Sequence, residues 1–116
     1  MDKGKPIFIF LTCTDKKEAE KITNHLLYKK LSVCIKGFPV RSMYLWHGKK
    51  EKSKEYLLII ESLENLFEKI EREVGKIHSY SQPAIIAIPI IKTTKGVKAW
   101  IKREVRQHES TKKTHH

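Results

Sequence analysis

The order in which apolar spacing changes along this chain restricts it to very few folds. Residues 7–11 are continuously apolar, which is typical of a central strand covered on both faces. Asp15 and Glu18 then have the spacing of a capping box, and apolar residues recur at helical intervals as far as Leu27. Residues 31–47 have extended character. The chain is therefore predicted to begin with a strand, a helix and a second strand.

The second half repeats this alternation. Residues 56–60 are predicted to form a third strand, and residues 63–77 form the clearest amphipathic helix. Residues 84–91 follow as a fourth strand, in which Pro89 favours an edge position, and residues 97–105 as a last helix. The order β-α-β-β-α-β-α predicts an α+β, ferredoxin-like split βαβ fold with one additional C-terminal helix. Both long helices then cover one face of an antiparallel sheet, and the third strand lies between the first and second.

Length and charge limit the organisation of the chain. Its 116 residues suffice for one domain, expected over residues 1–106, followed by a polar tail at 107–116. The longest apolar run, residues 84–91, is far shorter than the roughly 20 residues that cross a bilayer. We therefore expect a cytoplasmic protein with no membrane partner.

The formal net charge of +11 raises the question of nucleic acid. The lysines are spread over nearly every predicted element, and no RNA-binding or helix-turn-helix pattern is present. The densest group, Lys49, Lys50, Lys52 and Lys54, is expected in a hairpin turn, where a solvated surface is its simplest explanation. On this pattern nucleic acid is not expected as a partner.

The second strand is too long for its own sheet. At roughly 3.3 Å per residue, residues 31–47 would extend about 55 Å, so part of the strand must overhang. In the distal half Tyr44 and Trp46 share one face and Met43 and Leu45 share the other, so neither face is fully polar. An open apolar edge favours pairing with another copy of the chain. Tyr44 and Trp46 are the candidate assembly residues.

A monomeric alternative is that Gly37 and Pro39 break this segment into two short strands. The two cysteines, Cys13 and Cys34, are expected on strands about 10 Å apart, too far for a disulfide within one subunit. Buried free thiols are their simplest interpretation.

Histidine is the residue type most suggestive of a metal site here. His78 lies in the turn before the fourth strand, where imidazole could ligate a metal or simply stabilise a helix C-terminus. His108, His115 and His116 form a tail that could bind metal adventitiously. The sequence contains no glycine-rich phosphate loop, HExxH motif or nucleophile elbow, so no enzymatic activity is expected.

Several spaced motifs in residues 7–105 together resemble the CutA divalent-cation tolerance proteins. They are Thr12-x-x-Asp15, Leu31-Ser32-Val33-Cys34, Ser42-x-Tyr44-x-Trp46-x-Gly48, His78-x-Tyr80-x-x-Pro83 and Trp100. The resemblance implies a ferredoxin-like subunit that assembles as a homotrimer through long second strands. It also implies tolerance to copper and other divalent cations, with copper binding.

The resemblance places candidate residues in a cleft between subunits. Carried over by position, these are Cys34, Trp46, His78 and Tyr80, with His78 as the candidate copper ligand. Lys36 stands where the family commonly has Asn, and it joins the candidate cleft residues.

Two carboxylates common in the family are absent beside the histidine. Ser79, Ser81 and Ala84 occupy the positions of a family Pro and two Glu residues. Together with Lys36, these replacements make the expected cleft more positive. An alternative function is therefore a trimeric regulatory module, similar to the PII signalling proteins, that binds a small anionic ligand or a partner protein between subunits.

Overall fold

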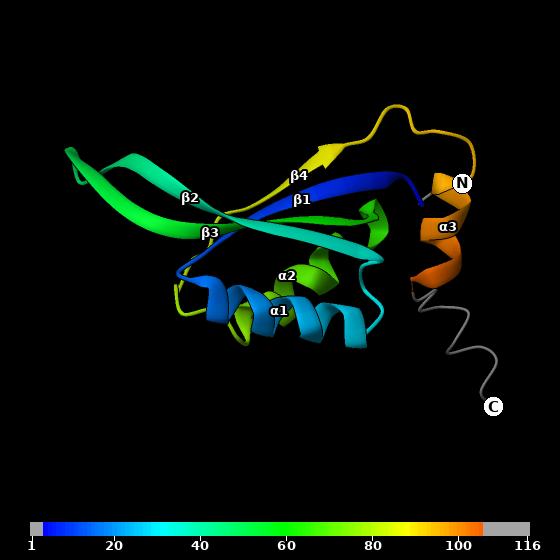
Figure 1. The fold of residues 1–116 in the computed structure, drawn as a ribbon, viewed down its shortest axis with the longest axis horizontal. Coiled ribbons are helices and arrows are strands. Elements are labelled where there is room, and N and C mark those ends of the chain that lie inside the picture. Colours follow the sequence, from blue (N-terminus) through cyan, green and yellow to red (C-terminus); the bar gives the residue numbers. More distant parts are fainter. Residues whose placement is uncertain (1–3, 106–116) are drawn as a thin grey trace.

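A four-stranded antiparallel sheet carries two helices on one face in the computed structural model, which describes residues 4–105 (Figure 1). The strands are β1 (Pro6–Cys13), β2 (Cys34–Trp46), β3 (Lys49–Leu63) and β4 (Ile85–Pro89). The helices are α1 (Lys16–Tyr28), α2 (Phe67–Gly75) and α3 (Val97–Glu104), with a 3-10 turn at Glu64–Leu66. The sheet order β2-β3-β1-β4 confirms the predicted topology, with β3 between β1 and β2 and with β4 at an edge. The expected domain boundary at residue 106 and the tail histidines lie outside the described residues.

The third strand is much longer than the predicted residues 56–60. It begins at Lys49, so the lysine group lies on a strand and the prediction of a turn there was wrong. The turn consists of His47 and Gly48, with φ of 51° and 80°, and positive φ at both residues is what a tight type I′ hairpin requires. Residues 49–55 are Lys, Glu and Ser and include none of the apolar residues by which a strand is recognised in a sequence. The strand was therefore missed here.

The predicted helix at 63–77 also changes at its start. Leu63 still belongs to β3, where it pairs with Pro6, and a single 3-10 turn leads into α2. Leu63 fits the apolar spacing of the predicted helix, but in the structure it is the last residue of β3.

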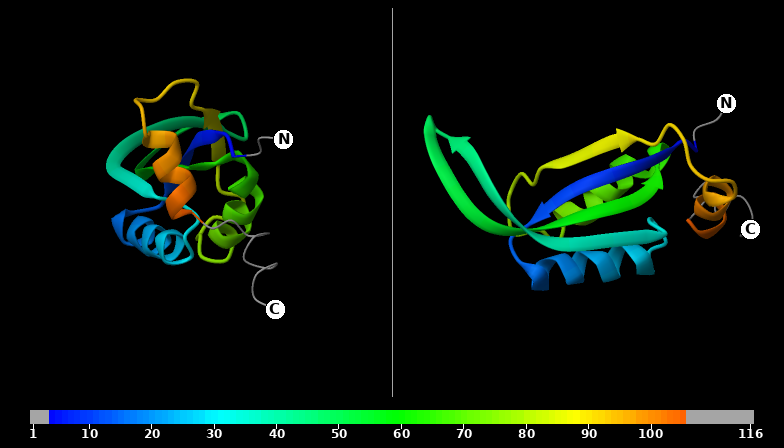
Figure 2. Two further views of the ribbon diagram at one scale, coloured as in Figure 1. Left: turned by 90° about the vertical axis from the view of Figure 1, so that its right-hand side faces the viewer. Right: turned by 45° about the horizontal axis from the view of Figure 1, so that its top comes forward.

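The core lies between the sheet and helices α1 and α2 (Figure 2). Alternate residues of β1 and β3 are buried against the helices, as the two-residue period of a strand dictates. The fully buried side chains from the strands and from all three helices include Ile9, Leu11, Ile60, Ile22, Leu26, Ile70 and Ile101. The hydroxyl of Ser62 is satisfied inside this core by donating to the carbonyl oxygen of Leu31 at 2.6 Å.

The hairpin of β2 and β3 projects beyond the rest of the sheet (Figure 2). Because β1 pairs with β3 only from Tyr56 onward, residues 40–46 and 49–55 pair only with each other within the described chain. We call residues 40–55 the hairpin arm. Strand β2 runs unbroken through Gly37 and Pro39, so the expected overhang is confirmed and a break at these residues is excluded.

Candidate functional site

Three side chains of different chemistry meet where β1 ends. Cys13 is the last residue of β1, Glu18 lies in the first turn of α1, and His78 follows α2. The ligand atoms of these three residues all lie within 4.8 Å of one another. The structure therefore gives His78 two neighbours that could share a metal ion with it.

Glu18 fastens the start of α1 to the turn after α2. Asp15 caps the helix by accepting from the Glu18 amide at 2.9 Å, and Glu18 Oε1 accepts from the Thr14 amide at 2.8 Å. Glu18 Oε2 accepts from the Ser79 amide at 2.6 Å. Burial alone would raise the pKa of this carboxyl, but the two amide donors hold it below its usual value. Glu18 is therefore an anion at neutral pH.

His78 is held by hydrogen bonds on both ring nitrogens. Its side chain is fully buried. Nδ1 accepts from the Tyr80 amide at 3.0 Å, so Nε2 carries the proton and donates it to the Thr12 carbonyl oxygen at 2.8 Å. This arrangement uses the whole hydrogen-bonding capacity of a neutral imidazole.

Cys13 is a protonated thiol in the isolated subunit. Burial and the nearby carboxylates of Glu18, Asp15 and Glu55 raise its pKa to about 12. The same carboxylates create a negative potential that attracts a cation. A bound metal would displace the thiol proton, because thiolate is the form that ligates.

The donor set fits a divalent transition metal. Thiolate, imidazole and carboxylate are the ligands of zinc and copper sites. Metal–ligand bonds of about 2.0–2.3 Å place tetrahedral ligand atoms roughly 3.5 Å apart, so the group must contract by about 1 Å. Binding through His78 Nε2 also replaces its bond to Thr12, so the site is preformed in composition but not in hydrogen bonding.

A larger hollow lies beside this group, at the base of the hairpin arm. Its volume is about 660 Å³, and its lining includes Tyr44, Trp46 and Tyr80 together with Glu51 and Glu55. None of the described residues that line it is Lys or Arg. The hydroxyl of Tyr80 donates to Glu55 Oε2 at 2.6 Å, and this bond, reinforced by burial, raises the pKa of Tyr80 to about 12. Ser81 and Ala84 also line the hollow.

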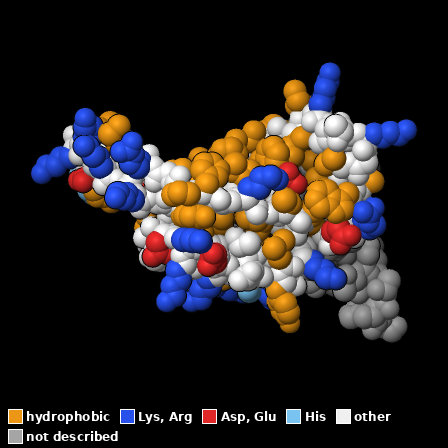
Figure 3. All heavy atoms as spheres, viewed as in Figure 1, with side chains coloured by type: hydrophobic (Ala, Val, Ile, Leu, Met, Phe, Trp, Pro, Cys, Tyr) orange, Lys and Arg blue, Asp and Glu red, His pale blue; other side chains and the backbone are white. Residues whose placement is uncertain are grey.

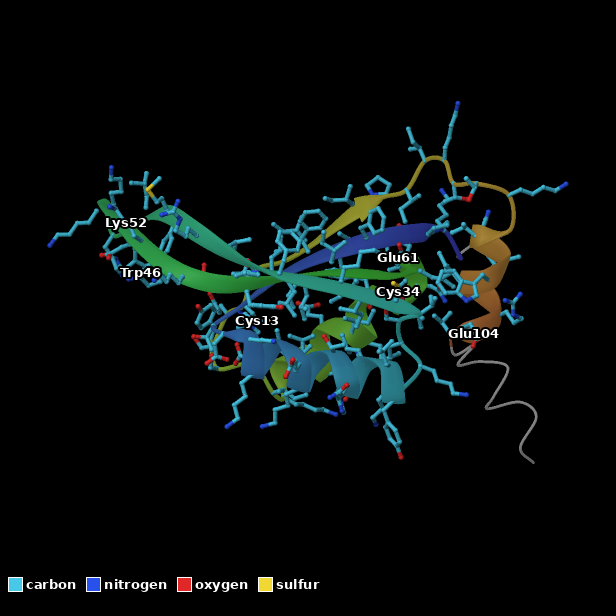
Figure 4. The ribbon with its side chains drawn as sticks, in the orientation of Figure 1. Cys13, Cys34, Trp46, Lys52, Glu61 and Glu104 are labelled. Carbon is cyan, nitrogen blue, oxygen red and sulfur yellow. The ribbon has the colours of Figure 1, made fainter. Side chains whose placement is uncertain are left out.

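The candidate residues from sequence therefore fall into two groups within one subunit. Trp46 and Tyr80 share the hollow, whereas Cys34 and Lys36 lie at the opposite end of β2 (Figure 4). There Lys36 Nζ lies 3.4 Å from Cys34 Sγ and 3.9 Å from a carboxylate oxygen of Glu61. Both cysteines are free, as expected.

Sequence reasoning overlooked Cys13 and Glu18 as partners of His78. The capping-box spacing of Asp15 and Glu18 was recognised, but capping accounts for a glutamate without any further role. The sheet topology offered a signal that could have linked them. Because β1 and β4 pair antiparallel, the end of β1 at Cys13 lies near the start of β4, and His78 is in the segment that leads into β4.

Known proteins resemble this chain in both sequence and structure. The family model of the CutA1 divalent ion tolerance protein matches residues 7–104. The chain belongs to this family. The CutA1 match thus extends from the second residue of β1 to the last residue of α3.

Individual relatives agree with the family assignment. A divalent-cation tolerance protein CutA of Archaeoglobus fulgidus is 39% identical over 98 residues, which are 84% of this chain and 96% of that protein. The CutA protein of Pyrococcus horikoshii is 31% identical, over 87% of this chain and 99% of its own. The solved structure of a periplasmic divalent cation tolerance protein CutA from A. fulgidus superposes with a TM-score of 0.84 at 38% identity, covering 87% of this chain and 99% of its own.

Membership of this family does not by itself fix the cellular compartment of the chain. Within residues 4–105, no helix is long and apolar enough to cross a bilayer. One CutA relative is described as periplasmic, so the cytoplasmic location of this chain stays a prediction.

Proposed function

We propose that this chain is a non-enzymatic, homotrimeric divalent-cation tolerance protein that binds copper or a similar ion at Cys13, Glu18 and His78. One observation carries the metal assignment: a thiol, a carboxylate and an imidazole lie within 4.8 Å of one another in a buried position. Thiolate, carboxylate and imidazole are the ligand types of zinc and copper sites, and a metal ion would take the place of the hydrogen bond from His78 Nε2 to the Thr12 carbonyl oxygen.

The uncovered face of the sheet supports self-association. Helices α1 and α2 both lie on the other face (Figure 1). The open face is formed by apolar side chains that are half-buried or exposed: Phe8, Phe10, Phe38, Leu57, Ile59, Ile86 and Ile88. Figure 3 shows hydrophobic side chains gathered over the central part of the molecule, with a few polar and charged side chains among them. A patch of this kind on a soluble domain marks an interaction surface, and a second copy supplies a matching one.

The hairpin arm extends the same face. Tyr44 and Trp46 follow Phe38 at even positions of β2, so they share its side of the strand. Trp46 is 61% exposed in the isolated subunit. In the proposed trimer the arm lies on a neighbouring subunit, and it would carry Trp46 toward that subunit's Cys34 and Lys36.

A calorimetric titration tests the metal site. Cu²⁺ is titrated into the full chain with His108, His115 and His116 changed to Gln, so that these histidines cannot bind the ion. Zn²⁺ is titrated in parallel because it cannot oxidise the thiol. Saturable binding near one ion per subunit is expected. His78→Asn and Cys13→Ser should each abolish it.

The matched control is His47→Asn, which removes an exposed imidazole and leaves a residue that tolerates positive φ. This variant should bind as the parent does. Binding that survives both His78→Asn and Cys13→Ser would contradict the assignment, as would the absence of any saturable binding.

A further inference from the structure

The two-residue period of β3 separates the charges that alternate along the sequence of the hairpin arm. Lys50, Lys52 and Lys54 point to one side of the arm. Glu51 and Glu55 point to the other side, as does Lys49, and the two glutamates line the hollow. The charges are therefore not evenly mixed. One side of β3 in the arm carries lysines as its only charged residues, and the other carries both glutamates and one lysine.

Strand β2 adds to the basic side. Its odd residues face the same way as the even residues of β3, because Arg41 pairs with Lys54, Met43 with Lys52 and Leu45 with Lys50. The basic face of the arm thus consists of four cations and two apolar residues: Arg41, Met43, Leu45, Lys50, Lys52 and Lys54. In Figure 3 blue Lys and Arg side chains crowd the projecting end of the molecule.

The apolar residues of this face are unusually accessible. Met43 is 66% exposed and Leu45 is 76% exposed, and both lie on β2 near the turn end of the arm. Solvation of a basic surface needs neither of them, and each exposed apolar side chain has an unfavourable contact with water. Their position between cations indicates a partner that offers negative charge and apolar material together.

The cations of this face repel one another in the free protein. Arg41 lies directly opposite Lys54 across the ladder, and like charges in that position destabilise a strand pair. None of the four cations has an ion-pair partner among residues 4–105. A hollow of about 660 Å³, lined by Arg41, Met43, Lys52 and Lys54 with Ser42 and Ser53, leaves room for a phosphate group between them.

We infer that the basic face of the hairpin arm docks on the surface of an anionic lipid bilayer. Phosphate headgroups would neutralise the four cations, and Met43 and Leu45 would enter the acyl boundary beneath them. Absence of a spanning segment, on which the expectation of no membrane partner rested, does not bear on such peripheral binding.

Two other polyanions suit this face less well. A nucleic acid would neutralise the cations but leave Met43 and Leu45 in water, and the face has no aromatic side chain on which bases could stack. A protein partner is disfavoured because lysine is depleted in protein–protein interfaces, whereas three lysines border this face.

Docking is compatible with the proposed trimer and independent of the metal site. Tyr44 and Trp46, the candidate assembly residues, lie on the opposite side of the arm. The basic face therefore remains outward when the arm lies on a neighbouring subunit. Cys13, Glu18 and His78 contribute nothing to the basic face, so loss of metal binding and loss of docking are separable.

Vesicle co-sedimentation tests the inference. The full chain is mixed with phosphatidylcholine vesicles that contain either no anionic lipid or an equal part of phosphatidylglycerol. Binding is expected only to the anionic vesicles and should weaken as salt is raised. Changing Lys50, Lys52 and Lys54 together to Gln should weaken it by about fivefold per charge, or roughly a hundredfold in all.

The matched control changes Lys16, Lys17 and Lys21, which are exposed on α1, to Gln. It removes the same total charge and should weaken binding less than threefold. Met43→Ser with Leu45→Ser should also reduce binding while leaving the lysines in place. Native mass and circular dichroism establish that each variant is folded.

Three results would overturn the inference. The first is an unaltered protein that fails to bind anionic vesicles, and the second is a control that weakens binding as much as the arm variant. The third is a Met43 and Leu45 variant that binds vesicles normally while duplex DNA competes with them equally well, since this would indicate only general attraction to polyanions.

Discussion

The amide of Tyr80 donates to Nδ1 of His78 at 3.0 Å, and this bond determines which tautomer the buried imidazole adopts. A backbone N–H can only donate, so Nδ1 must be unprotonated and Nε2 must carry the proton. A metal bound to Nε2 of a neutral imidazole requires the proton on Nδ1, where it would oppose the Tyr80 amide. Metal binding and the position of the Tyr80 backbone are therefore coupled.

Nitrogen-15 NMR of the imidazoles tests this coupling. In the metal-free protein His78 should show the Nε2–H tautomer, and Zn²⁺ should shift the Tyr80 amide resonance in step with saturation. The amide of Tyr28, at the exposed end of α1, serves as the internal control. The coupling would be contradicted if the metal-free protein had the proton on Nδ1, or if the Tyr80 amide resonance did not shift at saturating Zn²⁺.

Metal affinity should rise with pH because of Cys13. Its thiol has a pKa of about 12 in the metal-free protein and must lose its proton to bind. Binding therefore releases one proton per ion from this group, and the association constant should increase about tenfold per pH unit between pH 6 and 8. Calorimetry in buffers of different ionisation enthalpy counts the protons released. A proton count of zero would show that the thiol is not a ligand.

The fold could be read from the sequence because it depends on local periodicity. The apolar run at 7–11 and the repeat after Asp15 each match one secondary structure, and handedness rules leave one topology for the resulting order. Pro89 even identified the edge strand, since a strand that lacks a donor is tolerated there.

The candidate site was less accessible to the same reasoning. His78 was singled out as a loop histidine, but the Cys13 thiol that lies within 4.8 Å of it is 65 positions away in the sequence, and no local spacing encodes that proximity. The charge separation on the hairpin arm was missed for another reason. Once Lys50 and Lys52 were taken as turn residues, the two-residue period that sorts them from Glu51 could not be applied.

The open sheet face predicts a variant that dissociates the assembly. Ile88 on β4 lies opposite Phe8 and is 39% exposed in the isolated subunit. Ile88→Glu would bury a charge in the proposed interface and should reduce the native mass to that of one subunit in light scattering. Ile91→Glu is the matched control, because Ile91 lies beyond β4 and is 89% exposed. Equal masses for the two variants would count against the interface.

Trp46 provides a second test of assembly. Within one subunit its side chain is largely exposed, so Trp46→Ala should scarcely affect the folding of an isolated chain. If a neighbouring subunit buries it, the truncation should cost about 3–5 kcal/mol. A melting temperature that falls, and that becomes more dependent on protein concentration, is the expected result. An unchanged melting temperature at every concentration would place Trp46 outside the interface.

Acid should remove a specific bridge between α1 and α2. Glu73 is buried and accepts from His25 Nε2 at 2.7 Å and from Lys76 Nζ at 2.9 Å, and these bonds lower its pKa from 4.5 to about 2. A depressed carboxyl pKa stabilises the fold above the unfolded value and loses that effect as pH falls through the folded value. The stability advantage of the parent over Glu73→Gln should be constant above about pH 4.5 and vanish toward pH 2. Urea unfolding across this range measures it, and an advantage independent of pH would contradict the mechanism.

Gly37 allows β2 to pass close to the side chains of β3. A Cβ added at this position would lie 2.9 Å from Leu58 Cδ2 and 2.9 Å from Tyr56 Cε2. Leu58 is buried in the core and the Tyr56 ring is rigid, so neither can move aside without disturbing its own packing. Gly37→Ala should therefore destabilise the protein by about 1–3 kcal/mol, although alanine also lowers the conformational entropy of the unfolded chain, which by itself would stabilise the fold. Gly75→Ala, where an added Cβ meets nothing within 4 Å, should be neutral or stabilising by about 0.4–1 kcal/mol. Equal effects of the two substitutions in denaturant unfolding would show that the close approach at Gly37 is not what constrains this strand.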